Sequence, residues 1–146
     1  CPAGAAFGRK SGDDFAGRVY VMFDYLMSKV PLGQRVALAV ARALHGGMLP
    51  AAALCYVWDP DAPVDMSGDS PYSARVRMIV VRSGRQTGRW LDESRDLRRD
   101  FSRMFGDEYG QGIPPILAVG LAADTDQTGS RVGTDFADVR LEIAGP

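Results

Sequence analysis

The sequence has very little histidine, cysteine and lysine, and these shortages exclude several classes of function. One histidine, His45, among 146 residues gives little support for a catalytic triad, and no GxSxG motif is present. The two cysteines, Cys1 and Cys55, form no CxxC, so neither a zinc site nor a disulfide framework is indicated. Lys10 and Lys29 are the only lysines, and the remaining fifteen of the seventeen cationic residues are arginines. Arginines favour specific anion contacts or internal ion pairs, and a GC-rich coding bias is the other explanation of their excess.

Long apolar runs and an excess of one charge are also missing. No run approaches the roughly twenty apolar residues of a membrane helix, so we expect no membrane span. A net charge of -1 gives no electrostatic reason to expect a nucleic-acid partner. The 46% of hydrophobic residues is the share of an ordinary folded protein, and the length suits one domain over residues 1–146.

What the sequence does contain is short segments in which apolar and polar residues alternate, the period of a β-strand. Three share the pattern, at 18–23 (RVYVMF), 54–58 (LCYVW) and 75–81 (RVRMIVV). Further strands are predicted at 116–123 and 138–143, and helices at 34–44 and 94–105. Strands with one apolar face, joined by turn-rich loops, predict a mainly β antiparallel sandwich with one or two short helices. The strand, helix, strand order at the start leaves an α+β sheet as the alternative.

The segment from Asp124 to Gly129, DTDQTG, has the opening of a calcium-binding loop. Oxygen-bearing side chains occupy positions one, three and five, a glycine occupies position six, and Asp135 falls at position twelve. These types are also ordinary turn residues after a strand, so a turn or a polar ligand contact is the other interpretation. The candidate metal ligands are Asp124, Asp126, Thr128 and Asp135.

Arginines and aromatic residues recur on the strand faces that are predicted to point away from the core. If the three strands are neighbours, these side chains share one surface, where aromatic rings stack on a ligand and arginines bind its hydroxyls or anions. The alternative is that a helix covers this surface and that the arginines pair with nearby aspartates. Trp90 follows a Gly-Arg turn and fits either the core or a ligand platform. The candidate ligand-binding residues are Asp14, Arg18, Tyr20, Tyr56, Trp58, Arg75 and Arg77.

Four phrases, DDFAGRVYVMFDY, LPAAALCYVWD, YSARVRMIVVRSG and AADTDQTG, together resemble the bacterial domain of unknown function family numbered three thousand and forty-seven. The resemblance runs from about Gly12 to Ile143. Its motif positions include every candidate metal-ligating and ligand-binding residue above except Tyr20 and Asp135. Gln127 stands where the family usually has Asn. It implies an exported bacterial protein, periplasmic or secreted, with a jelly-roll or galactose-binding-like sandwich. Family members carry strand-like sequence before the position where this chain begins, so we expect N-terminal strands to be lacking. The strand near Arg18 to Phe23 would then be unpaired, a site for a homodimer.

Three functions are consistent with these sequence features. The first is a non-catalytic binding module that recognises a saccharide or another polar ligand through the aromatic and arginine face, with calcium ordering the Asp124 loop. The second is a hydrolase acting on carbohydrate or an ester through Asp124 and Asp126, which a shared deep pocket with Trp58 would favour. The third is a structural or partner-binding envelope protein, favoured if the helix at 34–44 buries the aromatic face.

Overall fold

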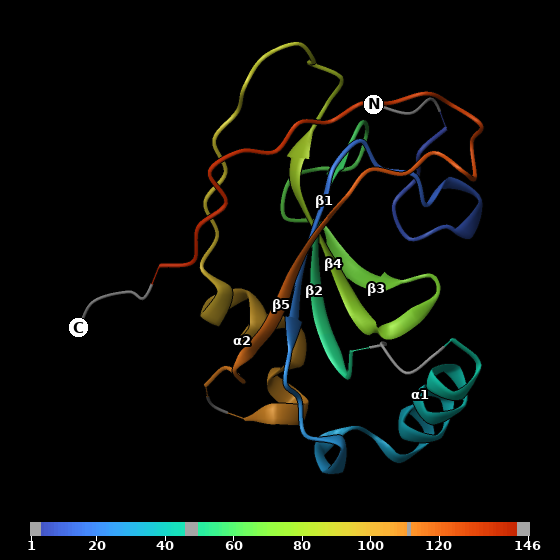
Figure 1. Cartoon of the computed structure of the whole chain (residues 1–146), viewed down its shortest axis with the longest axis vertical. Coiled ribbons are helices and arrows are strands. Elements are labelled where there is room, and N and C mark those ends of the chain that lie inside the picture. Colours follow the sequence, from blue (N-terminus) through green and yellow to red (C-terminus); the bar gives the residue numbers. More distant parts are fainter. Residues whose placement is uncertain (1–3, 46–49, 111, 143–146) are drawn as a thin grey trace.

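The structure is a computed structural model that describes residues 4–45, 50–110 and 112–142, and its main element is one five-stranded sheet (Figure 1). The sheet order is β3-β4-β2-β1-β5. All neighbouring strands are antiparallel except β2 and β4, which run parallel. The strands are β1 (Arg18–Phe23), β2 (Ala52–Asp59), β3 (Ser67–Ser70), β4 (Ser73–Ser83) and β5 (Ile116–Ala122). The helices are α1 (Leu32–His45) and α2 (Leu97–Tyr109), with 3-10 turns η1 (Lys10–Gly12) and η2 (Met27–Lys29).

The prediction of a mainly β chain with two short helices is confirmed, and the mixed sheet is also compatible with the α+β alternative. The layers differ from those of an antiparallel sandwich, because the described residues form one sheet and not two facing sheets. Helix α2 packs its buried aromatic rings on one face, where a sandwich has its second sheet. The N-terminal segment packs Phe15 on the other face. Each sheet face therefore has a cover, as burial of its apolar side chains requires.

Most predicted elements are present, with two corrections. Six of the seven predicted elements are formed, several of them longer than expected. They are the strands predicted at 18–23, 54–58, 75–81 and 116–123 and the helices predicted at 34–44 and 94–105. The predicted strand at 138–143 is wrong for its described part, 138–142, which has no regular structure. Asp138 there has φ of 52°, which an extended strand cannot accommodate. β3, whose sequence is SGDS, was not expected because it carries no apolar residue.

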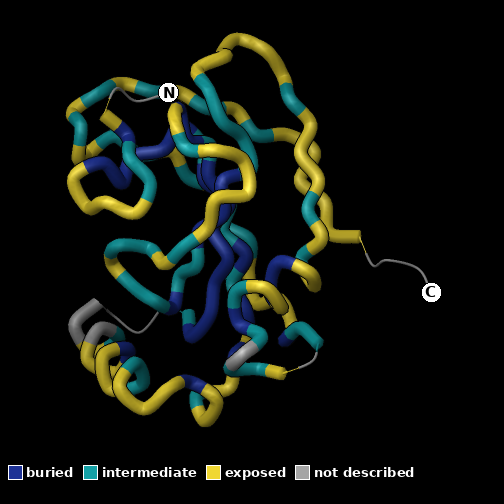
Figure 2. Tube along the Cα trace, turned by 180° about the vertical axis from the view of Figure 1, so that it is seen from behind, coloured by how far each residue is buried: buried dark blue, intermediate teal, exposed yellow. Residues whose placement is uncertain are grey.

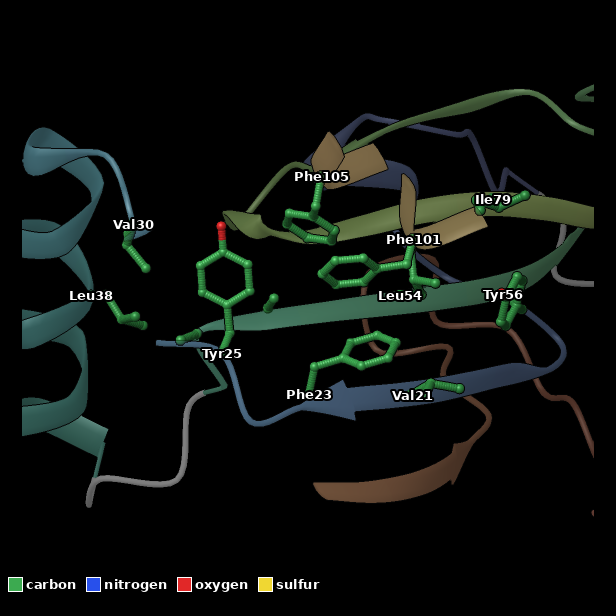
Figure 3. Close-up of a cluster of buried hydrophobic side chains, with 12 residues drawn as sticks. Val21, Phe23, Tyr25, Val30, Leu38, Leu54, Tyr56, Ile79, Phe101 and Phe105 are labelled. Atoms are coloured by element: carbon green, nitrogen blue, oxygen red, sulfur yellow. The ribbon is translucent and has the colours of Figure 1, made fainter. Parts of the chain in front are cut away.

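The larger hydrophobic cluster lies between the sheet and α2 (Figure 3). Phe101 and Phe105 of α2 stack with ring centroids 5.1 Å apart, and Phe101 meets Phe23 of β1 edge-on at 4.7 Å. Leu54 and Ile79 from β2 and β4 complete the floor of this cluster. Figure 2 shows that burial concentrates on the central strands, whereas α1 and the C-terminal segment are largely exposed. The core therefore sits at the middle of the sheet.

The opposite sheet face carries a second, smaller cluster. Phe15, just before β1, packs against Cys55, Val57, Met78 and Val80. Alternation along β2 assigns successive residues to opposite faces, so Cys55 and Val57 face Phe15 while Leu54 and Tyr56 face α2. Strand β1 lies between β2 and β5, so the expectation of an unpaired strand at Arg18 to Phe23 is wrong; the sheet edges are β3 and β5.

Candidate functional site

The structure separates the arginine and aromatic candidates, which do not share one surface. Arg18 and Tyr20 pair in register with Val57 and Cys55, on the face covered by Phe15. Tyr56, by contrast, belongs to the cluster under α2. Arg75 and Arg77 also bond to residues of α2 and its surroundings. The predicted binding face is therefore split between the two sides of the sheet.

Arg75 and Arg77 of β4 hold helix α2 through one carboxylate. Glu108 accepts from the Arg75 guanidinium at 2.6 Å and from the Arg77 guanidinium at 3.1 Å. Arg75 is buried and also donates to the Ala51 carbonyl at 2.7 Å and to Gln34 of α1 at 2.9 Å. A buried cation needs such partners, and the set joins β4 to both helices. This matches the alternative in which the arginines make internal ion pairs.

Tyr56 is likewise tied into the interior. Its hydroxyl donates to Asp100 of α2 at 2.9 Å, and Arg95 makes a two-pronged contact with the same carboxylate, each bond 2.9 Å. Burial, with Asp100 close by, raises the pKa of Tyr56. Burial of the aromatic face by the helix at 34–44 would have favoured a structural or partner-binding role, but the helix that covers Tyr56 is α2.

Trp58 is the candidate that does reach an open surface. It is the last residue but one of β2 and follows a register shift, and its main-chain N–H donates to the Gly17 carbonyl at 3.2 Å. Its indole N–H donates to the Gly84 carbonyl at 2.7 Å, which satisfies the polar end of the ring. Together with Trp90, Trp58 lines a cleft of about 390 Å³. The two are the only tryptophans in the chain.

The walls of this cleft come from segments far apart in the sequence. One wall is the loop after β4, which carries Trp90 with 69% of its surface exposed. Gly88 in this loop has φ of 77°, a conformation that favours glycine. The other is the segment 132–135, held against the start of β1 by a hydrogen bond from the Thr134 hydroxyl to the Ala16 carbonyl. Polar side chains from both walls line the same space: Thr87, Arg89, Thr134 and Asp135.

A cluster of carboxylates forms near the start of β1. One oxygen from each of Asp14, Asp124 and Asp126 lies within 4.8 Å of the other two. Asp14 is fully buried, and its carboxylate accepts from the backbone N–H groups of Gln127 at 3.2 Å and Thr128 at 2.6 Å. The buried Asp14 thus fixes the loop whose sequence resembles a calcium loop, and brings its own oxygens to that loop.

The predicted metal ligands are only partly gathered. Asp124 and Asp126 meet, but Asp14 takes the place expected for Asp135, which lines the cleft with the tryptophans. Thr128 contributes its N–H to Asp14, while its hydroxyl donates to Ser130 at 3.0 Å. Neither Asp124 nor Asp126 lines the cleft of Trp58. The shared deep pocket that would favour a hydrolase is therefore not present among the described residues.

Charge in this cluster is only partly balanced. Arg18, itself buried, pairs with Asp13 at 3.1 Å and with Asp124 at 3.5 Å. Burial raises the pKa of Asp13 above its ordinary value, against the opposing effect of Arg18. Burial acts in the same direction on Asp14, but the hydrogen bonds from Thr128 and Gln127 outweigh it, and the pKa of Asp14 is lowered. Asp14 is therefore held as a carboxylate.

Cys55 gives no sign of a nucleophile. It is buried beside Tyr20 and Arg18, and burial raises the pKa of the Cys55 thiol to about 12. A reactive cysteine needs the opposite shift and access to solvent. His45, the only histidine, has a side chain outside the described residues.

The fold and the cleft define a mainly β domain with one mixed sheet, a helix on one face and an open site at one end of its central strands. Residues 1–140 match the family described as protein of unknown function (DUF3047), and the chain belongs to that family. No match was found among the curated proteins or among the solved structures. None of the described helices is long and apolar enough to cross a bilayer.

Proposed function

We propose that this protein is a non-catalytic binding module and that its ligand is a saccharide held in the cleft between Trp58 and Trp90. The observation that carries the proposal is the meeting of the only two tryptophans with polar side chains in one open cleft. Indole rings offer flat apolar surfaces for the C–H faces of a sugar ring, while nearby hydroxyl, guanidinium and carboxylate groups bond its hydroxyls.

The shape and chemistry of the cleft favour a polar ligand over an apolar one. Thr87 and Arg89 on one wall stand across from Thr134 and Asp135 on the other, so donors and acceptors converge on the space beside the rings. Arg89 and Asp135 carry opposite charges, which suits a neutral ligand with many hydroxyls. A periplasmic or secreted location, as the family resemblance implies, would expose such a site to extracellular glycans.

The carboxylate cluster supports calcium as an aid to binding. Asp14, Asp124 and Asp126 provide the oxygen ligands that calcium prefers. Asp14 lies two residues before Ala16, whose carbonyl accepts from Thr134 of the cleft wall. A cation that orders the loop from Asp124 to Gly129 would therefore also order the chain leading into that wall.

The test is ligand binding by one variant of the cleft and one control variant. Trp90→Ala should weaken binding of a saccharide found on a glycan array by at least about tenfold, or about 1.4 kcal/mol, because it removes one stacking surface. Trp90 is largely exposed, so its removal should leave the fold intact, as circular dichroism would verify. Leu32→Ala is the control, because Leu32 is an exposed apolar residue of α1 outside both the cleft and the carboxylate cluster.

Calorimetric titration measures both variants against wild type. Equal affinities of wild type and Trp90→Ala for every glycan that binds would contradict the proposal. So would a glycan that perturbs neither tryptophan, since tryptophan fluorescence in this chain arises only from Trp58 and Trp90.

A further inference from the structure

The two edges of the sheet are protected very differently. β3, at one edge, has only four residues, and its Asp69 pairs with Arg77 at 3.0 Å. β5, at the other edge, has seven residues, ILAVGLA, without any charged or polar side chain. Native sheets usually blunt an edge with charge, proline, a bulge or a short strand, because an unpaired edge recruits another strand. β3 is short, charged and irregular at Ser70. β5 has one register shift, at Leu117, but no charge and no proline within the strand.

The outer side of β5 is open in the described part of the chain. Its inner side pairs with β1, and no other described strand adjoins it. The flanking backbone bonds, from Asp24 to the Pro115 carbonyl and from Asp124 to the Phe15 carbonyl, also run toward the β1 side. Leu117 and Leu121 are 67% and 46% exposed, although both are large apolar residues. An apolar strand with unpaired backbone groups is a docking surface for another extended strand.

We propose that β5 pairs antiparallel with β5 of a second copy of this chain, forming a homodimer with a continuous ten-stranded sheet. Val119 is the midpoint of Ile116–Ala122, so pairing centred there engages the whole strand with itself. Leu117 of each copy then lies opposite Leu121 of the other. Leu117 lies at the register shift of β5 and Leu121 in its regular part. Both are large, exposed apolar side chains, and cross-strand apolar pairs stabilise a sheet.

A second copy fits this edge better than a foreign strand because β5 is complementary to itself. A twofold contact brings each residue against the same surface of its partner, and any charge in the strand would meet a like charge nearby. β5 has no charge, so self-pairing brings no repulsion within the strand. The twofold axis is perpendicular to the sheet, which leaves both copies of α2 on the same side.

The experiment is sedimentation velocity over a range of protein concentrations, with the full chain. Wild type should dimerise, and the double variant Leu117→Lys/Leu121→Lys should raise the dimer dissociation constant at least a hundredfold, because each lysine then faces another lysine. Both side chains are substantially exposed, so circular dichroism should show an intact fold. Leu32→Lys is the matched control, an exposed leucine on α1 that should leave the dimer unchanged.

Hydrogen exchange of the backbone distinguishes the edge from other interfaces. In wild type, amide protection in β5 should rise with protein concentration, and in the double variant it should not. Wild type that stays monomeric at all concentrations overturns the proposal. A dimer that Leu32→Lys disrupts, or one whose β5 amides gain no protection, also overturns it. These outcomes leave the saccharide proposal untouched, since the cleft contains no residue of β5.

Discussion

Asp13 and Asp14 are neighbours in sequence, yet their environments move their pKa values in opposite directions. Burial raises the pKa of Asp13, and Arg18 only partly opposes it. Asp14 is also buried, but its two oxygens accept from the backbone of Gln127 and Thr128, and its pKa falls. The difference follows from their partners, because two backbone N–H groups stabilise the Asp14 carboxylate while Asp13 has Arg18.

We expect Asp14→Asn to destabilise the protein at neutral pH by about 1–3 kcal/mol, the usual cost of losing a hydrogen bond to a buried charged acceptor. A group with a lowered folded pKa contributes stability above its unfolded pKa, and that contribution is lost as the pH falls through the folded pKa. The difference between wild type and variant should therefore be constant near neutrality and shrink in acid below about pH 4. Urea unfolding at several pH values measures it, and a difference that grows on acidification would contradict the assignment.

At the same scale, the sequence indicated which loop gathers carboxylates but not which residue completes the group. Counting along the loop predicted Asp135, because calcium loops are defined by spacing. The carboxylate that joins Asp124 and Asp126 is Asp14, which bonds to Gln127 across 113 positions of the sequence. Such a partner depends on how β1 and β5 pair, and residue spacing contains no information on that.

Helix α2 is the element on which the main core depends. Phe101 is completely buried and contacts Phe23, Tyr25, Phe105 and Tyr109 through its ring. The helix begins at a favourable cap, where the Asp96 side chain accepts from the Arg99 N–H at 3.0 Å. Ring packing around Phe101 thus holds α2 on the sheet.

Phe101→Ala should lower the free energy of unfolding by about 3–5 kcal/mol, since it removes a buried ring and leaves a cavity. Phe101→Leu should cost less, because it retains most of the apolar volume. Arg103→Ala, at an exposed position of the same helix, should change stability by no more than about 0.5 kcal/mol. Guanidinium unfolding measures the stability of the three variants. Equal losses of stability in Phe101→Ala and Arg103→Ala would show that the core does not depend on Phe101.

The individual elements could be predicted well, and their arrangement could not. Alternation is a local property, so the strand at Arg18 to Phe23 was predicted with the bounds that the structure has. The parallel pairing of β2 with β4 and the placement of Arg18 and Tyr56 on opposite faces depend on sheet order. No local pattern encodes that order, and the shared arginine surface failed for this reason.

The stability of the whole molecule gives the test for calcium. If a cation binds Asp14, Asp124 and Asp126 in the folded state only, its binding free energy adds to the stability of the fold. At a free concentration one hundred times the dissociation constant, the gain is about 2.7 kcal/mol, which raises the melting temperature by several degrees.

Thermal melting with calcium and with chelator should therefore differ for wild type, and Asp124→Asn/Asp126→Asn should melt alike in both. Asp61→Asn/Asp69→Asn is the control, a double change of exposed carboxylates outside the cluster. A wild type that is indifferent to calcium and chelator would rule out the metal while leaving the saccharide site open to its own test.

The cleft is lined by segments of unequal strength. Trp58 belongs to a central strand, whereas the wall at 132–135 is part of a segment without helix or strand that rests on Ala16 and Gly17. Segments with few buried contacts open more often than the strands beside them. A ligand enclosed between the walls would leave when the weaker wall lifts, so its dissociation rate would follow that local opening. The contact of Thr134 with Ala16, just before β1, would then set the residence time of a bound glycan separately from its stacking on the two indole rings.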